Sequence, residues 1–186
     1  MLDLTELGAL IDKHHRQDLL RVQTLDRYDV VSDGGDYRRY LAGEANPDPT
    51  RKGPWLDHLR AIVASGRTWR NVHVVQLPLS DYLRYACEWG YAYNVTAGQD
   101  VRIVELPADE LLRAVAGVGD FWVIDCNLVV RMHYNASGRF NGAAVISDEQ
   151  DANLFRSVAG LLWRQAQPFT TWWAAHPQFH RQNAAA

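Results

Sequence analysis

The stretch FWVIDCNLVVRMHYNASGRFNGAAVI, residues 121–146, decides the fold class of this chain. It consists of three apolar segments separated by CN and NASG, which are turn-forming sequences. The middle segment, LVVRMHY, has the two-residue alternation of a strand, so its side chains divide between two faces. One face carries Val130, Met132 and Tyr134, and the other carries Val129, Arg131 and His133. We therefore expect three successive antiparallel strands.

Upstream of this stretch, strand and helix patterns alternate. Short segments rich in β-branched residues predict strands near residues 20–24, 71–77 and 100–105. Apolar residues at helical spacing predict helices at 4–14, 35–43, 55–65, 81–89 and 107–115, and a last helix that is capped by Ser147 and Gln150 and runs to Pro168. The proline-rich segment 45–54 is expected to be a surface loop.

Length and composition are those of one globular domain. The chain has 186 residues, of which 47% are hydrophobic and 22% charged. Together with the element order, this predicts an α+β fold: a single domain over residues 1–168, with a mixed, mostly antiparallel sheet and helices packed against it. Residues 169–186 are expected to form a C-terminal tail.

Charge and cysteine content exclude several classes of partner. Nineteen basic residues against 22 acidic ones give a net charge of −3, and the arginines are dispersed, so nucleic acid is not an expected partner. No apolar run is long enough to span a membrane, and the first residues are acidic where a signal peptide is basic. With two cysteines, Cys87 and Cys126, we expect reduced thiols and a cytoplasmic protein.

The sequence carries no signature of a catalytic, cofactor or metal site. There is no nucleophile elbow of the form G-x-S-x-G. The glycines of AVAGVGDF precede a strand rather than follow one, which is the wrong order for a dinucleotide site. His176 and His180 are four residues apart, but Pro177 lies between them and no acidic ligand is close in the sequence. We therefore expect no metal and no cofactor, and assign no catalytic residue.

The helix predicted over 81–89 carries the first candidate site. Asp81, Arg84 and Glu88 are spaced i, i+3, i+7, which places them on one side of that helix. An aromatic stripe runs beside them, formed by Tyr82, Tyr85 and Trp89. The charged residues are either a solvated ion ladder or one wall of a polar cleft that these rings also line.

The strands of residues 121–146 carry the second candidate site. Arg131 and His133 share a strand face, and Asp125 lies one hairpin away, with Asp120 just before the first strand. These residues are either cross-strand pairs on a solvated face or, if a helix covers that face, half-buried charges of the kind found at functional sites.

Several blocks of the sequence resemble an uncharacterised family of actinobacterial proteins. They are RYDV at residues 27–30, LSDYLR–EWGY–N–AGQD between residues 79 and 100, and FWVID–VVRMHY–G between residues 121 and 138. The similarity spans roughly residues 20–165. The function of that family is unknown, but its genes look like companions of helix-turn-helix regulators. The resemblance therefore implies a regulatory or signalling association rather than a reaction.

The order of elements is also similar to one half of a phospholipase D-like domain. In that family a histidine, a lysine and an aspartate with the spacing H-x-K-x-x-x-x-D carry out phosphoryl transfer. Here Asp125 falls on the aspartate position, whereas Asp120 and Val118 occupy the lysine and histidine positions. The resemblance implies a degenerate, non-catalytic copy that senses a ligand or a protein.

The sequence thus predicts a non-catalytic regulatory or sensing module that binds a small ligand or a partner protein, such as a helix-turn-helix transcriptional regulator. The expected binding residues are Asp81, Tyr82, Arg84, Tyr85, Glu88, Trp89, Asp125, Arg131 and His133. Arginines would hold an anionic group, and the aromatic rings would form an apolar wall. The alternative is a small cytosolic biosynthetic enzyme that uses His133 with Asp125 or Glu88 as general acid and base. The oligomeric state stays open.

Overall fold

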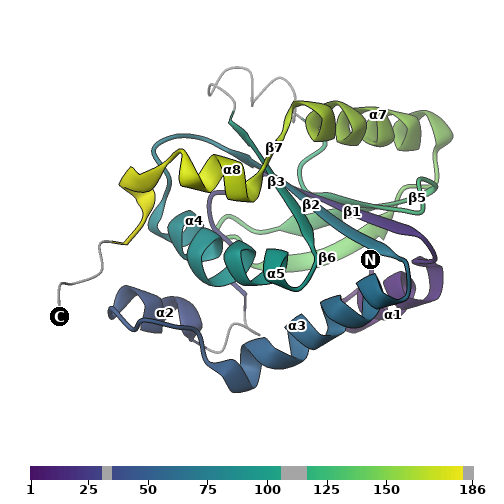
Figure 1. The fold of residues 1–186 in the computed structure, drawn as a ribbon. Coiled ribbons are helices and arrows are strands. Elements are labelled where there is room, and N and C mark those ends of the chain that lie inside the picture. The colour runs from purple at the N-terminus through teal and green to yellow at the C-terminus, as the bar shows by residue number, and fades with distance from the viewer. Residues whose placement is uncertain (31–34, 106–116, 182–186) are drawn as a thin grey trace.

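The computed structural model describes residues 1–30, 35–105 and 117–181 of the chain. In this part a seven-stranded sheet has the order β6-β5-β4-β1-β2-β3-β7 (Figure 1). The strands are β1 (Asp18–Gln23), β2 (Thr68–Val75), β3 (Asp100–Glu105), β4 (Phe121–Ile124), β5 (Leu128–Tyr134), β6 (Phe140–Val145) and β7 (Gln167–Pro168). β2 runs parallel to β1 and β3, and every other neighbouring pair is antiparallel. The predicted α+β fold with a mixed, mostly antiparallel sheet is confirmed.

Helices cover both faces of this sheet. α7 (Glu149–Gln165) packs on one face. On the opposite face lie α1 (Leu4–His14), α2 (Asp36–Leu41) and α3 (Pro49–Ala64). The same face carries a continuous helical segment, made of α4 (Asp81–Tyr85), the π-helix η2 (Ala86–Tyr91) and α5 (Ala92–Thr96). The chain ends on this face with α8 (Phe169–Ala174) and the 3-10 helix η3 (Pro177–Phe179). Among the described residues, no helix is both long and apolar enough to cross a membrane.

The two-residue alternation of the strands explains the two layers. In β1, Leu20 packs in the α7 layer, whereas Leu19 packs with α1 and α3. In β5, Val129 lies in the α7 layer, whereas Val130 and Met132 lie in the opposite one. The predicted division of β5 into two faces is therefore confirmed, and the predicted three-strand stretch forms β4, β5 and β6.

Two helix starts differ from the sequence prediction. α3 begins at Pro49, inside the segment expected to be a loop, because Asp48 caps the Thr50 N–H (2.9 Å) and a proline is well tolerated in the first helical turn. α7 is capped by Asp148, which accepts a hydrogen bond from the Asp151 N–H (2.9 Å), so the capping box expected at Ser147 and Gln150 was wrong. The helix predicted over 107–115 lies outside the described residues.

The segment after Pro168, which the sequence set apart as a tail, contributes side chains to the core. Phe169 and Trp172 are 2% and 1% exposed and pack against η2 and β3. His176 stacks on Trp172, with ring centroids 4.5 Å apart, and its Nδ1 donates to the Trp172 carbonyl (2.7 Å). This segment therefore packs against the same helical layer that holds the pocket described next.

A candidate ligand pocket

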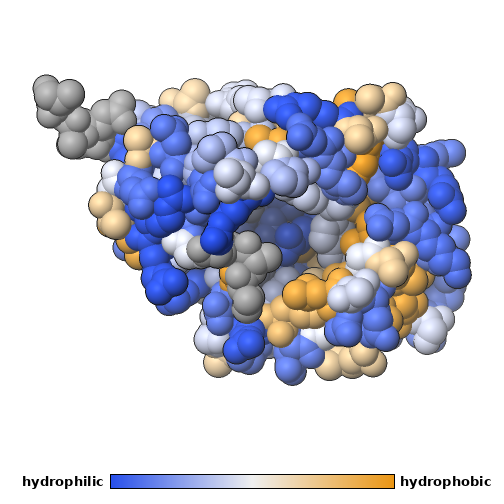
Figure 2. Space-filling model, turned by 90° about the horizontal axis from the view of Figure 1, so that it is seen from below, coloured by the Kyte–Doolittle hydropathy of each residue, from blue (hydrophilic) through white to orange (hydrophobic). Residues whose placement is uncertain are grey.

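A cavity of about 340 Å³ lies between the sheet and the helices α2, α3 and α4–η2–α5. It opens on the face shown in Figure 2, where hydrophilic residues lie at the bottom of a hollow. Its volume is at the lower end of the range of about 300–1,000 Å³ that is typical of small-molecule sites. The pocket is thus large enough for a ligand of one or two rings.

Polar side chains from three adjacent strands form the floor. The register places Arg21 of β1 beside Asn71 of β2 and Trp122 of β4, and places Gln23 beside His73. Because residues two apart in a strand point to the same face, all five side chains reach the pocket. The floor is therefore built on paired strands and not on a loop.

Arg21 is the charged group of this floor. Its guanidinium lies 5.2 Å from the ring centre of Trp122 and 5.7 Å from that of Tyr28, and Nη2 donates to the Tyr134 hydroxyl at 3.4 Å. No carboxylate of the described residues lies within ion-pair distance of it. Burial lowers the pKa of Arg21, but the surrounding tyrosines and Asp120 more than offset this, so the net shift is upward and the side chain stays charged.

Two hydrogen-bond donors at the floor, Arg21 Nε and Trp122 Nε1, have no partner within the described part of the chain, and both atoms are buried. The Asn71 amide lies beside them and acts on the Tyr91 hydroxyl, whose pKa burial raises and this amide lowers to a smaller extent. Buried polar atoms in proteins are almost always hydrogen-bonded, and the exceptions often mark a site for water, an ion or a ligand. These donors belong to residues that line one cavity, which favours an occupant that supplies acceptors.

Asp120, the nearest buried acid, is occupied by other partners. Its carboxylate accepts hydrogen bonds from the Thr24 N–H and Oγ1 (2.8 Å each) and from the Tyr28 hydroxyl (2.6 Å). Burial raises its pKa, against the opposing effect of Arg21 and these donors. Asp120 therefore raises the pKa of Arg21 through its charge but forms no hydrogen bond with it, and Arg21 Nε stays without a partner among the described residues.

His73 and Tyr91 form a buried polar pair beside the floor. A carbonyl oxygen can only accept, so His73 Nε2 donates to the Leu25 carbonyl (3.0 Å). The other nitrogen of the neutral ring, Nδ1, therefore accepts a hydrogen bond from the Tyr91 hydroxyl (2.6 Å). That hydroxyl also lies 3.1 Å from Gln23 Oε1. Burial lowers the pKa of His73 to about 4, so the ring is neutral at pH 7.

Aromatic rings form two walls above the floor. α4 and η2 supply Tyr82, Tyr85 and Trp89. In a regular α-helix Tyr91 would lie on the opposite side from Tyr82, since nine residues make about two and a half turns. The wider turns of η2 allow Tyr91 to line the same cavity, and such π-helical segments are frequent at functional sites.

The opposite wall comes from α3 and β2. Trp55 and Trp69 meet edge to face, with ring centroids 5.3 Å apart and planes at 88°. Asn94 of α5 joins this wall to the helix behind it, since its Oδ1 accepts from Lys52 Nζ (2.9 Å) and from Trp55 Nε1 (3.1 Å). The pocket therefore has rings on both sides and an ammonium group at its edge.

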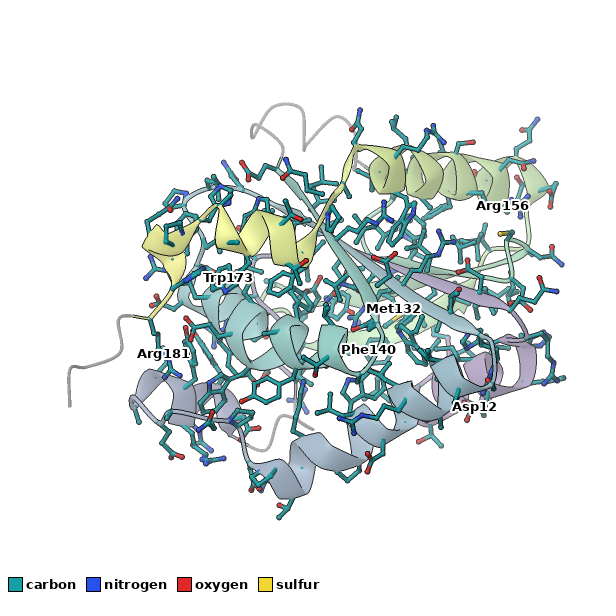
Figure 3. All side chains as sticks on the ribbon, viewed as in Figure 1. Asp12, Met132, Phe140, Arg156, Trp173 and Arg181 are labelled. Carbon is teal, nitrogen blue, oxygen red and sulfur yellow. The ribbon has the colours of Figure 1, made fainter. Side chains whose placement is uncertain are left out.

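The charged residues predicted on the helix at 81–89 do not line this pocket. Glu88 accepts hydrogen bonds from the backbone N–H (2.6 Å) and Nε (2.9 Å) of Arg181, which lies beside α2 (Figure 3). Arg84 lies over the Phe179 ring, 5.8 Å from its centre, and Asp81 is exposed. Two of the three are therefore engaged by the C-terminal segment.

The residues predicted in the strand region also lie elsewhere. The carboxylate of Asp125 accepts from the backbone N–H groups of Arg16, Gln17 and Asp18 (2.9, 2.9 and 2.8 Å). Burial acts to raise its pKa, but these donors more than offset it, so the net shift is downward. Arg131 and His133 are half-buried on the α7 face of β5. Of the nine predicted residues, the structure brings Tyr82, Tyr85 and Trp89 into one pocket and places the other six outside it.

The residues of the floor are not among those predicted from the sequence. The signal that could have found them is a pair of polar residues two apart in each of two buried strands, Arg21 with Gln23 and Asn71 with His73. Such pairs place polar groups on one face of an otherwise apolar sheet.

Comparison with known proteins gives a family but no described relative. No curated protein matches the sequence. A family model described as a domain of unknown function, DUF6879, matches residues 5–174, which is nearly all of the chain. The chain therefore belongs to the DUF6879 family.

Proposed function

We propose that this domain is a non-catalytic module that binds a small organic anion in the pocket. The observation that carries the proposal is Arg21, a half-buried arginine of the pocket floor whose guanidinium has no ion-pair partner among the described residues and whose Nε is a buried donor without a hydrogen-bond partner. A buried charge without a partner is costly, by several kcal/mol, and is retained in proteins mainly where a ligand or a reaction requires it.

The composition of the pocket supports binding over catalysis. The described lining residues include no serine, threonine or cysteine that could act as a nucleophile. Both ring nitrogens of His73 are engaged, and its pKa of about 4 leaves it a weak base. The alternative enzyme has less support, because His133 and Glu88 lie on opposite layers and Asp125 holds backbone N–H groups.

We further propose that the ligand-bound state is recognised by a partner protein in the cytoplasm. The resemblance to genes that accompany helix-turn-helix regulators supports this step, and both cysteines are free thiols, Cys87 buried and Cys126 exposed. The degenerate phospholipase D-like relationship stays a prediction and contributes nothing to the pocket argument.

Thermal unfolding of the full chain with a panel of organic anions tests the proposal. A ligand at 100 times its Kd stabilises a protein by about 2.7 kcal/mol, which for a chain of this size raises Tm by about 5–10 °C. We expect Arg21→Gln to abolish this rise and Arg21→Lys to keep part of it. Arg131→Gln is the matched control, since Arg131 is also a half-buried strand arginine but lies on the other face. An anion response that survives Arg21→Gln, or is lost in Arg131→Gln, would refute the proposal.

A further inference from the structure

We infer that the ligand is a planar aromatic monocarboxylate, with its carboxylate on Arg21 and Trp122 and its ring between the aromatic walls. This inference rests on the proposed function and narrows it to one chemical class. It joins two observations: one charged donor at the floor beside neutral donors, and rings on both sides of the space above it.

The charge of the floor matches a single negative charge. Arg21 is the one cation among the described strand residues that form the floor, and Asp120 acts on it from nearby. The remaining charges of the lining are Lys52 at the edge, Arg51, which pairs with Asp48 at 3.6 Å, and Asp36, which pairs with Arg39 at 2.9 Å. A dianion such as a phosphate monoester would leave a second negative charge desolvated at the floor.

The free donors also fit the shape of a carboxylate. A guanidinium presents Nε and a terminal nitrogen side by side, and this edge matches the two oxygens of a carboxylate. The guanidinium carbon lies 5.2 Å from the ring centre of Trp122 and 5.7 Å from that of Tyr28, and these contacts restrict the positions of the guanidinium before a ligand arrives. Trp122 Nε1 is a further donor that only an acceptor can satisfy.

The walls favour a flat, unsaturated body. Tyr82 and Tyr85 line one side, with ring centroids 5.7 Å apart, and Trp55 and Trp69 line the other. Aromatic rings gain additional attraction from other rings in stacked and edge-to-face contacts, beyond the area that they bury. With a volume of about 340 Å³, the cavity accepts one or two fused rings rather than a nucleotide with several phosphates.

Four matched compounds test the inference on the full chain by titration calorimetry and thermal unfolding. They are naphthoate, its neutral amide, the naphthyl phosphate substituted at the same carbon, and the fully saturated carboxylate of the same skeleton. We expect naphthoate to bind saturably with one site. The amide should bind at least about tenfold more weakly, since it has no negative charge to pair with Arg21. The saturated acid should also bind at least about tenfold more weakly, since it keeps the carboxylate but loses the ring contacts with both walls. Arg21→Gln should lose naphthoate binding by a similar factor, and Arg131→Gln should retain it.

Each other outcome overturns the inference in an identifiable way. Tighter binding of the phosphate, dependent on Arg21, would show a dianion site and leave the proposed function standing. Equal binding of the saturated acid would show that the rings do not select a planar body. If none of the four binds while other organic anions raise Tm through Arg21, the ligand class is wrong and the proposed function stands. If no organic anion raises Tm in a way that depends on Arg21, both the inferred ligand class and the proposed function are wrong.

Discussion

The buried His73 makes the stability of this protein depend on pH in a calculable way. Burial lowers its pKa in the folded protein to about 4, against 6.5 for an ordinary histidine. As the pH falls, the unfolded chain therefore binds the proton first, and the folded state is penalised. The contribution of neutral His73 to the free energy of unfolding is complete above about pH 6.5 and is lost progressively between pH 6.5 and pH 4.

The size of the loss follows from the two pKa values. At pH 5, protonation of His73 favours the unfolded chain over the folded protein by a factor of about 30, because the pKa is about 6.5 in the unfolded chain and about 4 in the folded protein. This factor corresponds to a loss of about 2 kcal/mol in the free energy of unfolding relative to pH 7.5. For a chain of this length that is a shift in Tm of about 4–8 °C. Burial also lowers the pKa of His15, which adds a loss of the same sign as the pH falls.

A variant isolates the contribution of His73. Urea unfolding of the wild type and of His73→Gln is measured at pH 7.5 and at pH 5. The variant loses the hydrogen bonds to Leu25 and Tyr91 at both pH values, but its stability should fall by about 2 kcal/mol less than that of the wild type between them. If the two proteins show the same pH dependence within about 0.5 kcal/mol, His73 is not the buried neutral group described here.

Three further outcomes are expected. Gly138→Ala should destabilise the protein by more than about 2 kcal/mol in urea unfolding, because a Cβ there would lie 2.4 Å from the Arg27 carbonyl oxygen. The control is Gly53→Ala in α3, where a Cβ meets no atom within 4 Å and should stabilise the protein by about 0.5–1 kcal/mol. Equal effects of the two substitutions would contradict this expectation. Arg181→Ala should lower Tm by several degrees, because it removes the Nε hydrogen bond to Glu88 and the Nη1 hydrogen bonds to the Tyr40 and Glu44 carbonyls, and Arg181→Lys should restore only part of the loss; full rescue by lysine would show that the forked geometry is not needed. Asp125→Asn should destabilise the protein by about 1–3 kcal/mol, because it weakens the hydrogen bonds that the carboxylate accepts from three backbone N–H groups, and it should leave the anion affinity unchanged. A loss of anion affinity at unchanged stability would instead show that Asp125 takes part in binding.

Strands were the part of the fold that the sequence predicted best. β4, β5 and β6 follow from alternation and turn residues within one short stretch, where local pattern and final structure agree. The start of α3 was missed because prolines at 47, 49 and 54 indicate a loop, although Asp48 and Pro49 also satisfy the rules of a helix start. Local rules conflicted there, and the contacts of the whole fold decided between them.

The candidate site was predicted only on its helical wall. Tyr82, Tyr85 and Trp89 follow from helical spacing, which is a local property. Arg21 could not be placed in the same way, because its neighbours Asn71 and Trp122 come from strands 50 and 101 residues further along the chain. Which strands pair is a long-range property. Glu88 was assigned to the site for the converse reason, since its partner Arg181 lies 93 residues away.

The position of the floor on β1 and β2 also determines which parts of the pocket move. Both strands are hydrogen-bonded on two sides, β1 to β2 and β4, and β2 to β1 and β3. Their amide protons should exchange with solvent only when the whole domain unfolds. The six-residue α2 is held at its C-terminal end by Arg181 through the Tyr40 and Glu44 carbonyls, and we expect its amides to exchange through local opening. The pocket thus combines a floor whose amides we expect to exchange only on global unfolding with a side whose amides we expect to exchange more readily.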